Sequence, residues 1–123
     1  MKSLPVLILL LLLYNTLTAQ QNDKIVRIAR IEVDASQLEK YKAALQEGIE
    51  TSIRLELGVL TLYAVAEKNR PTSITVLEVY ANAEAYQSHI QTEHFKKYKN
   101  ATGNMIKSLE LIETTPIALG AKS

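Results

Sequence analysis

Residues 56–67 read ELGVLTLYAVAE, and the fold prediction depends on this stretch more than on any other. Gly58 ends a helix-like segment, and Val59 opens a run whose side chains alternate between two faces. Both faces are apolar: Leu60, Leu62, Ala64 and Ala66 on one, and Val59, Thr61, Tyr63 and Val65 on the other. A strand that is apolar on both faces is covered on both faces. We therefore expect a β-strand over residues 59–67 inside a layered domain.

Three further strands are predicted at residues 25–33, 73–81 and 109–112, where apolar and β-branched residues gather. The polar segment 68–72 contains Pro71 and predicts the turn of a hairpin between the strands at 59–67 and 73–81. Residue 103 is glycine, and it marks the end of the helical segment that comes before the last strand.

Two helical regions lie between these strands. The first has Ser36 and Glu39 at the spacing of a capping box. Its apolar stripe follows steps of three and four residues, at Leu38, Tyr41, Leu45, Ile49 and Ile53. In the second region Asn82 is a suitable N-cap, and Thr92 can cap a second helical piece after a bend.

The resulting order is strand, helix, strand, strand, helix, strand, which is the split βαβ arrangement. It predicts an α+β, ferredoxin-like domain with a four-stranded antiparallel sheet and both helices on one face. Tyr63, Val65, Val76, Val79 and their neighbours leave this sheet without a polar face, so its other face is too apolar for a chain of ~100 residues to leave uncovered. We expect a homodimer in which two sheets face each other as a dimeric α/β barrel. A monomer with one face partly exposed is the alternative.

The first 20 residues have the pattern of a cleaved signal peptide. Lys2 precedes an apolar run over residues 4–13, which is too short for the ~20 residues that span a bilayer. Cleavage after Ala19 or Gln20 leaves a mature domain over residues 21–123, periplasmic or secreted and without a stable membrane anchor. An uncleaved anchor is the alternative.

Composition narrows the classes of function. Lys and Arg number 14 against 13 Asp and Glu, so the net charge is +1, and removal of Lys2 with the leader makes the mature part neutral. Such a domain has no electrostatic reason to bind nucleic acid. Cysteine is absent, which excludes disulfides, thiolate metal sites and thiol nucleophiles.

Several segments resemble the antibiotic biosynthesis monooxygenase (ABM) family, which includes the quinol monooxygenases. They are ELGVLTLY at residues 56–63, EVYA at 78–81, AYQSH at 85–89 and HIQTEHF at 89–95. The resemblance covers about residues 25–116, with Leu57 in place of the usual proline. It implies a homodimeric barrel with a pocket between sheet and helices. It also implies oxidation of quinols or polyketide phenols by dioxygen without a cofactor, although some members degrade haem. Haem enzymes of this fold rely on a tryptophan, and this chain has none.

His89 and His94 are the candidate catalytic bases, because they are the only histidines, lie in the family segment and titrate near neutral pH. Hydrogen bonding within a bent helix is the structural alternative for both. We expect no shared metal site: five positions are ~140° around a helix, so the rings would diverge unless the helix bends at Thr92.

Glu78 lies in an otherwise apolar strand, where a carboxylate is paired or perturbed. An ion pair with Arg27 or Arg30 is the structural interpretation, and orienting a histidine or binding a substrate hydroxyl is the catalytic one. Tyr63 and Tyr80 are candidate substrate contacts, since a tyrosine offers apolar area and one hydroxyl. Core packing is the alternative for both.

These observations predict a cofactor-independent monooxygenase that acts, outside the cytoplasm, on quinols or related electron-rich phenols with dioxygen. The alternative from another class is a non-catalytic dimeric barrel that binds a small hydrophobic ligand.

Overall fold

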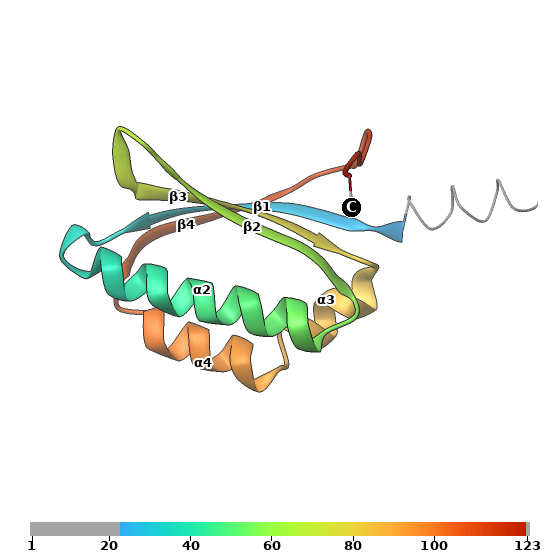
Figure 1. Cartoon of the computed structure of the whole chain (residues 1–123), viewed down its shortest axis with the longest axis horizontal. Coiled ribbons are helices and arrows are strands. Elements are labelled where there is room, and N and C mark those ends of the chain that lie inside the picture. Colours follow the sequence, from blue (N-terminus) through green and yellow to red (C-terminus); the bar gives the residue numbers. More distant parts are fainter. Residues whose placement is uncertain (1–22, 123) are drawn as a thin grey trace, which may run out of the picture.

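The computed structural model describes residues 23–122. Its elements in chain order are β1 (Ile25–Val33), the 3-10 turn η1 (Ala35–Gln37), α2 (Leu38–Leu55), β2 (Val59–Glu67), β3 (Arg70–Tyr80), α3 (Ala83–His89), α4 (Glu93–Thr102) and β4 (Ile106–Glu113). The strands are antiparallel in the order β2-β3-β1-β4, and all three helices cover one face of the sheet (Figure 1). The predicted ferredoxin-like fold is confirmed, with the second helical region divided into α3 and α4. The expected signal peptide lies outside the described residues.

The core lies between the sheet and the helices. Ala29, Ile31 and Val33 of β1 and Ile74 and Val76 of β3 face the helices and are buried, because the antiparallel register places Ala29 beside Val76 and Ile31 beside Ile74. Two tyrosines close this core from the helix side. The hydroxyls of Tyr41 on α2 and Tyr98 on α4 lie 2.7 Å apart, so each polar tip has a partner and the two helices are joined.

The opposite face of the sheet is partly uncovered. The C-terminal tail lies on this side (Figure 1), where the Thr114 hydroxyl donates to the carbonyl of Val26. Val26 and Val79 are buried on this face, whereas Tyr63 and Val65 are 68% and 64% exposed. Within residues 23–122, no helix combines the length and apolar character needed to cross a bilayer.

The helix start and two strand boundaries differ from the sequence prediction. The Ser36–Glu39 capping box is wrong: Asp34 accepts hydrogen bonds from the backbone N–H and the hydroxyl of Ser36 at 2.9 and 2.8 Å, and so caps η1 instead. A short side chain one turn earlier thus satisfies the free donors. β3 begins at Arg70, because the hairpin turn needs only Lys68 and Asn69, and β4 is longer than predicted, over residues 106–113, where it pairs with β1.

The junction between α2 and β2 needs glycine because another helix presses against it. A Cβ at Gly58 would lie 2.5 Å from the Cβ of Ala85 in α3. The Gly58 carbonyl also accepts the backbone N–H of Ala81 at 2.8 Å. The absence of a side chain therefore lets α3 approach the end of α2.

Gly58→Ala is expected to lower the free energy of unfolding by about 1–3 kcal/mol, because the clash forces the junction away from α3. Chemical denaturation checks this. Gly48→Ala is the matched control: its Cβ would lie 3.7 Å from Tyr98, an ordinary contact, and alanine in a helix gains about 0.5–1 kcal/mol. Equal stability of the two variants would contradict a clash at the junction.

Candidate active site

A cavity of about 140 Å³ lies between the sheet and the helices. Apolar side chains from β1, α2, β3 and β4 form most of its wall, among them Ala29, Ile49, Val76, Leu109 and Leu111. An apolar cavity of roughly 150 Å³ holds a benzene molecule in another protein. The space therefore suits one aromatic ring. Its polar side chains gather around two centres, one at His89 and one at Glu78.

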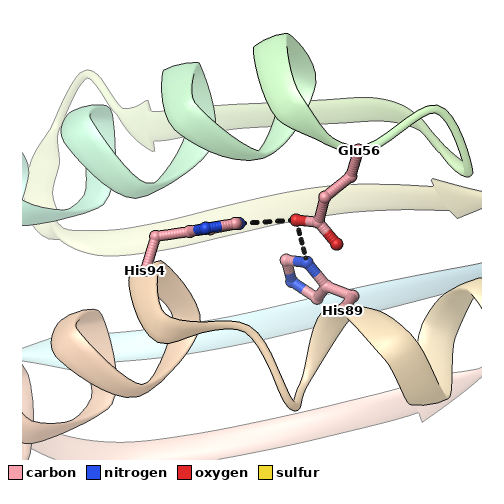
Figure 2. Close-up of side chains that lie close together, drawn as sticks. All are labelled: Glu56, His89 and His94. Atoms are coloured by element: carbon pink, nitrogen blue, oxygen red, sulfur yellow. Dashed lines mark hydrogen bonds and ion pairs between the residues drawn. The ribbon is translucent and has the colours of Figure 1, made fainter.

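The first centre joins Glu56, His89 and His94. One carboxylate oxygen of Glu56, Oε2, lies 2.9 Å from Nδ1 of His89 and 2.6 Å from Nε2 of His94 (Figure 2). The side chains of all three are at most 17% exposed. Glu56 stands at the C-terminal end of α2, His89 at the end of α3 and His94 in the first turn of α4. Three helix ends therefore converge on one carboxylate.

The break between α3 and α4 brings the two imidazoles together. Thr92 links the pieces: its hydroxyl donates to the carbonyl of His89 at 2.7 Å and accepts the backbone N–H of Phe95 at 3.2 Å. This confirms Thr92 as the cap of the second piece. The expectation that the two rings diverge is wrong, since their centroids are 6.4 Å apart and both contact Glu56.

Glu56 is the charged member of this cluster. Burial acts to raise the pKa of Glu56, but hydrogen bonds from His89 and His94 outweigh it and hold the pKa below its usual value. Glu56 is therefore ionised at neutral pH and each imidazole donates to it. With both imidazoles neutral, the cluster carries one negative charge, which the two N–H groups of the imidazoles stabilise.

The hydrogen bond to Glu56 also fixes the tautomer of His89. A neutral imidazole carries one proton, and donation from Nδ1 to the carboxylate leaves Nε2 as an acceptor. His89 is buried, lines the cavity, and packs against Tyr80 and Phe95 with ring centroids 5.4 and 5.1 Å away. An oriented imidazole with a free acceptor nitrogen at an apolar cavity has the form of a general base.

The second centre is Glu78 with Tyr80. The Tyr80 hydroxyl donates to Oε1 of Glu78 at 2.7 Å, and both side chains line the cavity. Burial raises the pKa of Glu78 above its usual value, against the hydrogen bond from Tyr80 and the charge of Arg27. Burial likewise raises the pKa of Tyr80, so this hydroxyl stays protonated. The arrangement offers a carboxyl group as a partner for a substrate hydroxyl.

The predicted ion pair of Glu78 with Arg27 or Arg30 is wrong for the part of the chain that the structure describes. Arg27 stands between two carboxylates, with Glu78 beside it on β3 and Glu113 beside it on β4. Its guanidinium pairs with Glu113 at 2.5 Å and lies 4.1 Å from the ring centre of Tyr86. Arg30 is exposed and belongs to the other sheet face. The partner of Glu78 is the Tyr80 hydroxyl.

Glu78→Gln is expected to raise the free energy of unfolding at neutral pH. The pKa of Glu78 is higher in the folded protein than the value of 4.5 expected for the unfolded chain. The free energy of unfolding therefore falls as the pH rises from 4.5 through the folded pKa, because the buried carboxyl group becomes charged. The gain from the substitution should therefore vanish below that pH window, as denaturation at several pH values would reveal. Glu110→Gln, at an exposed position of β4, is the control and should show no such trend.

Three positions differ from the expectations drawn from sequence. Tyr63 lies on the outer face of the sheet, away from the cavity, so its suggested substrate contact has no support within one subunit. In the sequence, Glu56 and Tyr86 stand out only as members of the segments 56–63 and 85–89 that resemble the family. Both belong to the site. The signal that could have revealed Glu56 is an acidic residue at the end of a helix that adjoins a strand.

A ring-sized apolar cavity with an oriented histidine defines a small-molecule site on a ferredoxin-like domain. The model of the family described as "Antibiotic biosynthesis monooxygenase" matches residues 24–101. This chain belongs to the antibiotic biosynthesis monooxygenase family. Among curated proteins none matched the chain.

Solved structures agree with this assignment. A protein assigned as an antibiotic biosynthesis monooxygenase from Bacteroides thetaiotaomicron VPI-5482 is 54% identical, and the match covers 84% of this chain and 98% of that one with a TM-score of 0.81. One assigned as a monooxygenase from Lactobacillus acidophilus NCFM is 30% identical over 77% of this chain and 45% of its own, with a TM-score of 0.74. A third structure, from Nitrosomonas europaea, is 20% identical over 78% of this chain and 92% of its own, with a TM-score of 0.73. At this identity it supports the fold alone.

Proposed function

We propose that this protein is a cofactor-independent monooxygenase that oxidises quinols or related electron-rich phenols with one aromatic ring. The observation that carries the proposal is the Glu56–His89 hydrogen bond, which leaves the Nε2 of a buried histidine as an acceptor at an apolar cavity. The family assignment and the names of the related structures support the same reaction class.

The chemistry follows from these groups. Nε2 of His89 takes the phenolic proton, and Glu56 stabilises the imidazolium that forms. The phenolate gives an electron to dioxygen, and the resulting substrate radical and superoxide combine at a ring carbon as a peroxide. His89 returns its proton to this peroxide. Loss of the ring hydrogen together with hydroxide then releases water and leaves a quinone carbonyl. One dioxygen is consumed, one oxygen atom enters the product and one leaves as water.

The second centre fits the other end of such a substrate. Glu78 and Tyr80 line the same cavity and offer hydrogen bonds to a second ring hydroxyl, as in a quinol. His94 contacts the same oxygen of Glu56 and holds that carboxylate in place. The mostly apolar wall of the cavity also strengthens each of these interactions, because it lowers the local dielectric constant.

Oxygen consumption tests this function directly. We expect saturable uptake of dissolved oxygen by the purified protein with one-ring quinols, without added metal or flavin, and slower uptake with polycyclic phenols that exceed the cavity. Saturable binding of a quinone without any oxygen uptake would favour the non-catalytic binding barrel instead. The apolar lining of the cavity is the feature that such a binding role would use.

Two further proposals concern assembly and location. Tyr63, Val65 and Leu77 leave an apolar outer sheet face 37–68% exposed, and a second copy of the chain would cover it as a homodimer. Light scattering should give twice the mass of one chain, and Val65→Asp should halve the measured mass.

We also propose that residues 1–20 export the protein to the periplasm or medium. Recovery of only full-length chain in the cytoplasm would exclude this.

A further inference from the structure

We propose that Glu56, His89 and His94 form a binding site for one divalent transition-metal ion of the zinc class, and that metal and catalytic proton transfer exclude each other at His89. Each residue offers one ligand atom, and these three atoms all lie within 4.8 Å of one another. The set contains two imidazoles and one carboxylate, the donors that zinc and neighbouring metals prefer.

The geometry is close to what an ion requires. Because bonds from zinc to nitrogen and oxygen are about 2.0–2.2 Å long, two ligand atoms on one ion lie about 3.0–3.5 Å apart. Oε2 of Glu56 is 2.9 Å from one imidazole nitrogen and 2.6 Å from the other. Each contact is now a hydrogen bond, and replacement of its proton by a metal requires these two separations to widen by less than about 1 Å.

The surroundings suit a metal as well. The three side chains are 8–17% exposed, so few water molecules compete for the ion. Both histidines line the cavity, so a water molecule or a ligand within it can complete the coordination. Thr92 joins the two helix ends that carry the histidines, and so keeps the ligands in place before the ion arrives.

Occupation by a metal would change which nitrogen of His89 carries the proton. A neutral imidazole that binds a metal through Nδ1 must keep its single proton on Nε2. Nε2 is the nitrogen that accepts the substrate proton in the proposed reaction. His89 then donates a hydrogen bond and cannot accept a proton. This step rests on the proposed function, whereas the binding of the metal does not.

Direct titration tests the site. Untagged protein, freed of metal by a chelator, is titrated with Zn²⁺ against a chromophoric competitor, with circular dichroism to verify folding. We expect one Zn²⁺ per chain in the wild type and in Glu93→Gln, an exposed carboxylate next to His94. His94→Ala and Glu56→Gln should lose saturable binding. Absence of saturable binding by the folded wild type would overturn the site, as would unchanged binding in both ligand variants.

Oxygen uptake tests the exclusion separately. We expect Zn²⁺ to abolish oxygen uptake, with half-inhibition at the Zn²⁺ concentration that half-saturates binding. A chelator should restore the uptake. Uptake that continues unchanged in fully loaded protein would overturn the exclusion. If the protein shows no uptake with any quinol, the titration alone decides the metal site, so failure of the proposed function is distinguishable from failure of the site.

Discussion

Replacement of His89 by alanine is expected to lower kcat for quinol oxidation by about 10²–10⁴-fold, the usual contribution of a positioned acid–base group. His89 is the more buried of the two histidines that line the cavity, and its hydrogen bond to Glu56 leaves Nε2 as an acceptor there. Dissolved oxygen measured with a saturating one-ring quinol gives the comparison.

Two controls separate the loss of a base from a loss of structure. Gln87→Ala changes an exposed position of α3, two residues from His89, and should leave turnover unchanged. Added imidazole should restore part of the activity of His89→Ala, because the deletion leaves a space of the right shape. Normal turnover by the doubly substituted protein without His89 and His94 would remove the mechanism.

Replacement of Glu56 by glutamine is expected to lower kcat by a comparable factor of about 10²–10⁴, although Glu56 itself touches no substrate. The amide is the same size but can donate toward Nδ1 of His89, which drives the imidazole proton onto Nε2. It also removes the negative charge that stabilises the imidazolium. A larger effect on kcat than on KM would indicate loss of proton transfer rather than loss of binding.

A conservative variant tests this positioning role. Glu56→Asp keeps the charge and should recover part of the activity lost in Glu56→Gln, in proportion to how well the shorter side chain reaches both imidazoles. Equal activity of Glu56→Gln and wild type would show that the carboxylate serves structure alone.

Sequence patterns predicted the fold well because apolar runs, and the polar segments between them, are visible along the chain. The strands at 25–33 and 59–67 have the predicted bounds, since both are apolar on two faces. The end of the hairpin turn was misplaced because Pro71 can lie within a strand whose hydrogen-bonding partner does not need its N–H. Caps were harder to assign: Asp34 and Ser36 are both suitable, and geometry decides between them.

The site was only half predictable. The resemblance indicated both histidines, but their meeting depends on a bend that residues 90–92 create, and a regular helix would have separated them. Glu56 is 33 residues from His89 in the chain, so only the folded structure, which brings the ends of α2 and α3 together, reveals their contact. The pairing of Glu78 with Tyr80 rather than with Arg27 depends on which of two carboxylates the arginine binds. The exposed Glu113 loses less hydration than a buried carboxylate when it pairs with Arg27.

The short link between α3 and α4 has a consequence for how such a protein changes over evolution. Residues 90–92 form the turn that carries the chain from α3 to α4. An insertion or deletion there would change where α4 begins and would move His94 away from Glu56, while the strand order of the sheet stays the same. Relatives of equal fold can thus gain or lose this chemistry through a change of one residue in length. Relatives of this protein are then better classified by the spacing between the two histidines than by overall sequence identity.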